Sequence, residues 1–163
     1  MKIINNFSQK EIKLLENINV NIENRDYTEQ EILLLSKIIY KNGYLDTNIT
    51  YKEAEFYRNI SERLKILSRV DIDKVSKYTK KKFDDDFYIS TVLMHGIVWN
   101  SPERINTHRK NQGKKLLTDE EYEKYKKIRK ENEEKFENYM EFLKEKYGQD
   151  LDAVSSYYSF KEI

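Results

Sequence analysis

Two stretches near the start of the sequence decide the fold: FSQKEIKLLENI at residues 7–18 and YTEQEILLLSKI at residues 27–38. Both contain a hydroxyl residue three positions before a glutamate, which is the capping box that begins many helices. An aromatic residue precedes each box, and an isoleucine follows it at the position that completes a hydrophobic staple. Leu and Ile then recur at helical spacing. The two stretches therefore predict two amphipathic helices, which open with Ser8/Glu11 and Thr28/Glu31.

The same pattern of helix start occurs twice more, at Thr50/Glu53 in TYKE and at Thr118/Glu121 in TDEE. A tandem functional repeat normally needs longer units and at least three copies. A capping residue, by contrast, stabilises any helix by about 1 kcal/mol. Four uses in unrelated contexts therefore indicate helix starts and not a duplicated functional motif.

Composition favours an all-α protein. The 163 residues include 38% hydrophobic and 36% charged residues, but only one Pro and four Gly. This balance suits amphipathic helices and argues against a turn-rich sandwich or barrel. The chain has no Cys, which excludes disulfides and thiolate metal sites. We expect a single-domain, irregular bundle of about six to seven helices with a long C-terminal helix.

Hydrophobic spacing predicts a helix in each of seven segments. The segment around residues 87–99 is ambiguous, because FYISTV is rich in strand-forming residues. No convincing partner strand exists elsewhere, so a helix is favoured. It would begin with Asp84, Asp85 and Asp86 in its first turn and, being apolar on most sides, would form the buried centre. The seven segments are 9–19, 29–41, 51–70, a short helix after Asp71, about 84–99, 119–147 and 151–158.

No linker marks a domain boundary, so residues 1–163 are expected to form one domain. The only subdivision that the sequence suggests is a helical core at 1–100, a basic loop at 101–117 and the long helix with a terminal short helix at 118–163. The first residues lack the apolar run of a signal peptide. The most apolar run, 87–99, is too short to span a bilayer. A cytoplasmic protein without membrane association is the expectation.

The residues that could carry chemistry are few. His95 lies in the apolar run and is expected to be a core histidine and not a catalytic base. His108 has cationic neighbours and is expected in an exposed loop. Residues 84–86 are three successive aspartates, whose side chains would point in different directions on a helix and so would not converge on a metal ion. No phosphate-binding loop, GxSxG or HExxH pattern is present. We therefore expect no metal, no cofactor and no catalysis.

Two basic segments, 63–82 and 104–115, are candidates for binding a nucleic-acid backbone, which needs clustered positive charge. The isoelectric point of about 7.7 and the long 42–49 connection argue against a helix-turn-helix DNA-binding protein. The candidate contact residues are Lys77, Lys80, Lys81, Arg104, His108, Arg109, Lys110, Lys114 and Lys115.

A protein interface is the favoured alternative. The chain has thirteen Tyr, and tyrosine contributes apolar area with a polar end. Charge also changes sign in blocks, with −3 over residues 84–100, +4 over 101–117 and −4 over 118–163. Tyr122, Tyr125 and Ile128 are the candidate interface residues, unless they pack on the protein's own core.

The sequence therefore predicts a non-catalytic macromolecule-binding protein. A small regulator or inhibitor that acts on a protein partner is the first expectation. A DNA- or RNA-binding regulator is the second, and an enzyme with an unrecognised active site is the third. The long C-terminal helix could also pair with a second copy of the chain.

Overall fold

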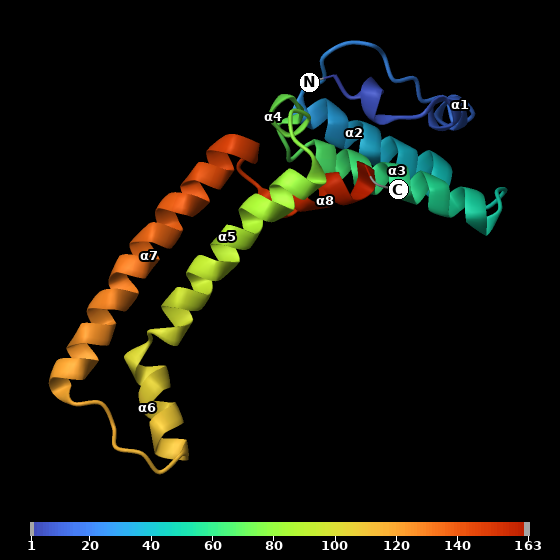
Figure 1. Ribbon diagram of the computed structural model, residues 1–163. Helices are drawn as coiled ribbons and strands as arrows, with labels where there is room; N and C mark the ends of the chain where they lie inside the picture. The colour runs from blue at the N-terminus through green and yellow to red at the C-terminus, as the bar shows by residue number, and fades with distance from the viewer. Residues whose placement is uncertain (1, 162–163) are drawn as a thin grey trace. The chain divides into compact units, whose positions relative to one another are not determined.

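The computed structural model describes residues 2–161, and within them it contains eight α-helices and no β-strand (Figure 1). The all-α prediction is therefore confirmed, as is a long helix near the carboxyl end, α7, which has 29 residues. The helices are α1 (Gln9–Glu16), α2 (Glu29–Ile39), α3 (Tyr51–Leu67), α4 (Ile72–Val75), α5 (Lys80–Trp99), α6 (Pro102–Asn111), α7 (Asp119–Tyr147) and α8 (Leu151–Lys161).

The predicted helix starts are present. Reciprocal capping boxes open α1, α2 and α3, at Ser8/Glu11, Thr28/Glu31 and Thr50/Glu53. At α7, the hydroxyl oxygen of Thr118 accepts from the backbone N–H of Glu121. The capping pattern therefore predicted the start of a helix correctly at all four places where it occurs.

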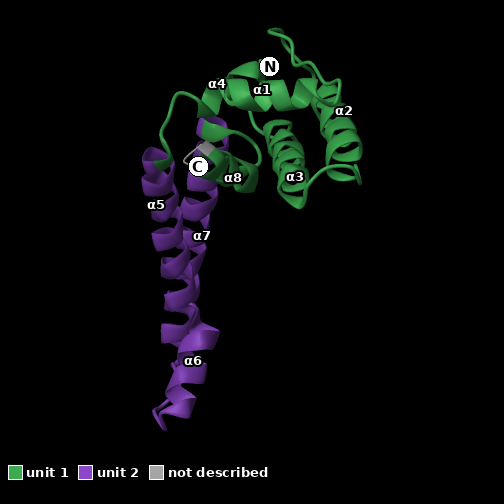
Figure 2. Ribbon diagram, turned by 90° about the vertical axis from the view of Figure 1, so that its right-hand side faces the viewer, with its two compact units in different colours: residues 1–80, 147–163 green, residues 81–146 purple. Residues whose placement is uncertain are grey.

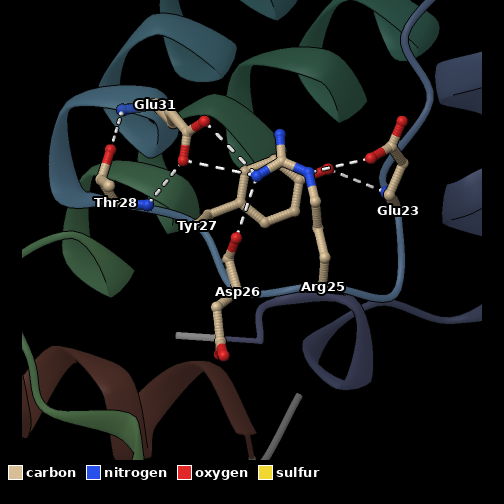
Figure 3. Close-up of polar contacts among 6 residues, drawn as sticks. All are labelled: Glu23, Arg25, Asp26, Tyr27, Thr28 and Glu31. Carbon is tan, nitrogen blue, oxygen red and sulfur yellow. Dashed lines mark hydrogen bonds and ion pairs between the residues drawn. The ribbon is translucent and has the colours of Figure 1, made fainter.

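Figure 3 shows how the second capping box is joined to the loop before it. The backbone N–H of Thr28 donates to the carboxylate of Glu31 at 2.7 Å, and it is the main reason that the pKa of this carboxyl is lowered. The guanidinium of Arg25 lies 3.8 Å from the centroid of the Tyr27 ring and also bonds Glu31 and Glu23. These contacts fix the direction in which the chain enters α2.

The chain divides into two compact units, coloured separately in Figure 2. Unit 1 comprises residues 1–80 and 147–163, and unit 2 comprises residues 81–146. These divisions differ from the subdivision that the sequence suggested, a helical core at 1–100, a basic loop at 101–117 and the helices at 118–163.

Unit 1 is built on the packing of α2 and α8 against α3. Ser36 of α2 and Ser61 of α3 allow close approach, and each buried hydroxyl bonds the other residue's backbone carbonyl at 2.8–2.9 Å. The hydroxyl of Tyr158 on α8 donates to the carbonyl of Val75 at 2.7 Å. Small polar residues and a buried tyrosine therefore join helices that apolar side chains alone would leave less precisely aligned.

Unit 2 is a helical hairpin in which α5 and α6 run antiparallel to α7. The lysine ammonium of Lys146 lies 2.8 Å from Asp86, while Asn132 donates to the carbonyl of Gly96. Farther along, the guanidinium of Arg129 lies 2.7 Å from Glu103. Residue numbers along α5 and α6 therefore rise while the numbers of their partners on α7 fall, which is the pattern of antiparallel packing.

Three expectations for unit 2 were wrong. Residues 80–99 do form a helix, but it is not a buried centre, because Tyr88, Val92 and Trp99 are half exposed or more. The helix begins at Lys80, so the aspartates at 84–86 lie beyond its first turn and do not cap it. The segment 101–117 is not a loop throughout, because it contains α6, whose first residue is Pro102, a favoured position for proline.

Candidate functional site

The most distinctive surface of the described chain is one face of α5, made of Tyr88, Val92, His95 and Trp99, which we call the outer face of α5. Tyr88 is 67% exposed, Val92 50% and Trp99 60%. Spacings of four, three and four residues place these side chains on one side of a helix. Phe83, Asp86 and Ser90, on the other side of α5, are buried.

This exposure follows from the composition of α5 and from its place in a hairpin. A helix that is apolar on several sides needs neighbours on several sides. Within unit 2, α5 makes its contacts to α7 from one side, through Asp86 and Gly96. Ile89 and Met94 are also exposed, at 46% and 40%, and extend the apolar surface beyond the outer face. Exposed apolar side chains gathered on one side of a helix are a common feature of interaction sites.

Charged residues of opposite sign stand at the two ends of the outer face. Asp85, one turn before Tyr88, is exposed. At the other end, the guanidinium of Arg104 on α6 lies 5.3 Å from the centroid of the Trp99 ring. This cation–π contact holds a positive charge beside the last aromatic side chain of the face.

The first basic segment, 63–82, is partly neutralised by nearby carboxylates. Arg63 pairs with Glu11 at 2.7 Å, and Lys65 pairs with Glu62 at 3.1 Å. Arg69 pairs with Asp150, and Lys82 pairs with Asp86. Cations that already hold carboxylates offer less to a phosphate backbone. Lys77 and Lys81 are exposed and Lys80 is half-buried, and their role as nucleic-acid contacts stays a prediction.

The second basic segment, 104–115, spans α6 and the loop after it. Lys110, Lys114 and Lys115 are exposed, and no carboxylate of residues 2–161 lies within ion-pair distance of them. Arg109 donates to the carbonyl of Lys115 at 3.4 Å, across the turn at Gly113. This segment lies in unit 2, whereas most of the first lies in unit 1.

The three candidate interface residues on α7, Tyr122, Tyr125 and Ile128, are half-buried. The hydroxyl of Tyr122 donates to the carboxylate of Glu103 at 3.1 Å, and this bond raises the pKa of the tyrosine. Tyr122 thus packs within the hairpin. A role for the three residues in partner binding stays a prediction. Their side chains expose less surface than those of the outer face of α5.

The two histidines do not occupy the expected places. His95 is exposed on the outer face of α5 and is not a core histidine. His108 is exposed as expected, but on α6 and not in a loop. The exposure of His95 could not be predicted, because an apolar run does not say how many neighbours the helix will have. For the same reason the outer face was not predicted, although the single Trp at the end of the run was a usable signal.

The described residues contain no cluster of His, Asp or Glu arranged to hold a metal ion. Of the three aspartates at 84–86, Asp86 is buried and bonded to lysines, while the other two are exposed. Unit 1 has an open cavity of about 700 Å³ next to Arg63. The guanidinium there bonds the Glu11 carboxylate and the backbone carbonyl of Asn6, which gives it a structural role.

Comparisons with protein-family models, with curated proteins and with solved structures found no match. Among residues 2–161, no helix has the length and apolar character needed to cross a bilayer. The surface of the molecule therefore provides the basis for a functional proposal.

Proposed function

We propose that the protein is a non-catalytic binding protein that acts through protein–protein interaction, and that the outer face of α5 is its binding surface. The observation that carries the proposal is the stripe of exposed Tyr88, Val92 and Trp99 on one helix. Trp and Tyr are the residues most often found to dominate binding energy at protein interfaces. In this proposal the protein acts as a small regulator or inhibitor of the protein that it binds.

The energetic reason for binding is the removal of this stripe from water. Burial of apolar surface contributes about 25 cal/mol per Å², and an aromatic side chain can bury about 150–250 Å². Because Tyr and Trp have few rotatable bonds, they lose little conformational entropy on binding. The spacing of positions 88, 92, 95 and 99 is also the kind of spacing that anchor residues have when a helix docks in a groove.

The test is affinity capture from lysate with nuclease and moderate salt, followed by measurement of the affinity for the captured protein. The Tyr88→Ala/Trp99→Ala variant should lose at least about a hundredfold in affinity, as expected for two central aromatic contacts. The matched control is Tyr51→Ala/Leu34→Ala, which removes side chains that are 80% and 58% exposed in unit 1. Equal loss in both variants, or in neither, would overturn the proposal.

A nucleic-acid-binding regulator is the second candidate, favoured by the exposed and unneutralised Lys110, Lys114 and Lys115. Phosphate contacts would make the affinity fall steeply with salt. Binding of a fluorescent single- or double-stranded oligonucleotide would be measured at several salt concentrations. If this candidate is right, the wild type binds the oligonucleotide in a salt-sensitive way and changing the three lysines to Glu abolishes that binding. If it is wrong, the wild type shows no salt-sensitive binding.

A further inference from the structure

We propose that the partner that fits the outer face of α5 is a second copy of this chain, packed antiparallel about a two-fold axis. This inference rests on the proposed function, since it takes the outer face as a protein-binding surface and names its occupant. A two-fold interface uses the same patch on both subunits, so the patch has to be complementary to itself. The outer face meets this requirement in its spacing and in its charge.

The spacing of the outer face reads the same in both directions. Intervals of four, three and four residues separate Tyr88, Val92, His95 and Trp99. Turning a second copy end for end about the midpoint between Leu93 and Met94 places each Tyr88 opposite a Trp99. The same rotation places Val92 opposite His95. Both aromatic side chains, which are 67% and 60% exposed, are then covered together.

The charged residues nearest to the two ends of the outer face have opposite signs. Residues 84–100 contain three aspartates and no cation, while residues 101–117 contain five cations and one glutamate. Arg104 stands beside Trp99, 5.3 Å from its ring centroid. When Trp99 lies opposite Tyr88 of the second copy, Arg104 is brought near Asp85 of that copy, which is one turn from Tyr88. The contact occurs twice, once at each end of the pair.

A parallel arrangement is disfavoured by the same charges. It would place each Asp85 beside the other and each Arg104 beside the other. Like charges in an interface cost binding energy, and this cost selects one register over another. Charge therefore determines the direction of packing, while the apolar stripe provides the driving force.

The size of the face sets the expected strength. The outer face, from Tyr88 to Trp99, is about 18 Å long, and a helix is about 10 Å wide. A face of this size is at the small end of specific interfaces, which favours a weak and reversible dimer. We expect a dissociation constant in the micromolar range and therefore a monomer–dimer equilibrium that depends on protein concentration.

The first experiment is sedimentation equilibrium of the full chain with exchanged charges. Asp85→Lys alone and Arg104→Glu alone should each weaken the dimer about tenfold, because each replaces two attractions by two repulsions. The two changes together in one chain should restore it. The restored attraction cannot form within a single copy. Arg104 stands beside Trp99, and Asp85 lies 14 residues or about 21 Å from Trp99 along α5. The control, Glu123→Lys/Lys124→Glu on α7, should leave the dimer unchanged.

The second experiment uses the absence of Cys in the natural sequence. A chain with Tyr88→Cys is mixed with a chain carrying Trp99→Cys, and disulfide formation is followed under mild oxidation at high protein concentration. Antiparallel packing brings the two different positions together, so the mixture should form cross-linked dimers. Equal positions lie about 16 Å apart along the paired helices, so neither variant alone should do so efficiently.

A wild-type chain that stays monomeric at concentrations of about 1 mM overturns this inference. So does a dimer whose charge exchanges are not rescued in the double variant. If the Tyr88→Ala/Trp99→Ala variant still loses a different captured protein in either of these cases, the proposed function stands with another partner. If that variant behaves as the wild type in every assay, both proposals fail.

Discussion

The carboxylate of Asp86 lies 2.8 Å from the ammonium nitrogen of Lys146, and this ion pair joins α5 to the end of α7. The two side chains are only 9% and 18% exposed. Lys82 approaches the same carboxylate at 3.1 Å, and the hydroxyl of Tyr139 donates to the backbone carbonyl of Asp86 at 2.6 Å. Burial of Tyr139 in this contact raises the pKa of its hydroxyl. Asp86 therefore organises one end of the hairpin that presents the outer face.

Replacing Asp86 by Ala should destabilise the hairpin by about 3 kcal/mol, because removing one partner of a buried pair leaves the other charge uncompensated. Asp86→Asn should cost less, since an amide oxygen can still accept from Lys146. Urea unfolding followed by circular dichroism measures the free energy of unfolding. The control is Glu141→Ala at an exposed position of α7, for which a change within about 0.5 kcal/mol is expected. Equal effects at the two positions would contradict a structural role for the ion pair.

Gly43 should not tolerate a side chain. A Cβ at this position would lie 2.4 Å from Cγ of Tyr57, whose hydroxyl donates to the carbonyl of Leu14 at 2.8 Å. Overpacking of this kind costs about 1–3 kcal/mol, so Gly43→Ala should lower the midpoint of thermal unfolding. Gly96→Ala is the matched control, because its Cβ would meet Asn132 at an ordinary 3.6 Å and Ala favours the helix. If both substitutions stabilise the protein, Gly43 is not packed closely against Tyr57 of α3.

Acid should weaken unit 2 through Glu103. The backbone N–H of Glu103 itself, the hydroxyl of Ser101 and the hydroxyl of Tyr122 hold the pKa of this carboxyl at about 2, below its usual 4.5. The fold favours the ionised carboxylate of Glu103. This group therefore contributes to the stability of the folded state above pH 4.5, and the contribution is lost as pH falls through about 2.

The comparison for this prediction is Glu103→Gln, studied by urea unfolding from pH 7 to pH 2. The variant should be less stable than the wild type at neutral pH, and the difference should disappear as pH approaches 2. A difference that stays constant with pH would mean that the charge of Glu103 has no part in it.

Alkali should weaken unit 1 through Tyr158. Burial is the main reason that the pKa of its hydroxyl is raised from 10.0 to about 12. The fold favours the neutral hydroxyl, which donates to Val75. The stabilisation is therefore fully present below pH 10 and is lost as pH rises through about 12.

Tyr158→Phe should lower the free energy of unfolding by about 1 kcal/mol at neutral pH, because the hydrogen bond to Val75 is removed. It should also reduce the loss of stability between pH 10 and pH 12. Unfolding curves across this pH range, with Tyr51→Phe at a position 80% exposed as control, test both effects. An unchanged alkaline transition in Tyr158→Phe would assign that transition to other tyrosines.

Local signals in the sequence predicted the helix starts, because a capping box involves only residues three positions apart. The long helix α7 was predicted at residues 119–147, where Thr118 opens it and Gly148 follows it. The helix α6 was not predicted, because its segment is so polar that no hydrophobic spacing marks it.

Burial was harder to predict than helicity, because it depends on tertiary neighbours that lie far away in sequence. The apolar run at 87–99 is equally compatible with a central helix and with one arm of a hairpin. His95 and Trp99 were therefore misjudged or overlooked, although the helix that carries them was expected. The ion pairs that neutralise Arg63 and Arg69 involve Glu11 and Asp150, which no local pattern connects to them.

The most direct test of the outer face as a protein-binding surface uses the fluorescence of Trp99, the only Trp in the sequence. We would measure quenching by acrylamide at rising protein concentration and with any captured partner. If the outer face binds protein, quenching should fall and the emission should shift to the blue as the complex forms, since the 60% exposed indole becomes covered. If association is measured while quenching of Trp99 stays unchanged, binding occurs elsewhere and the central claim is wrong.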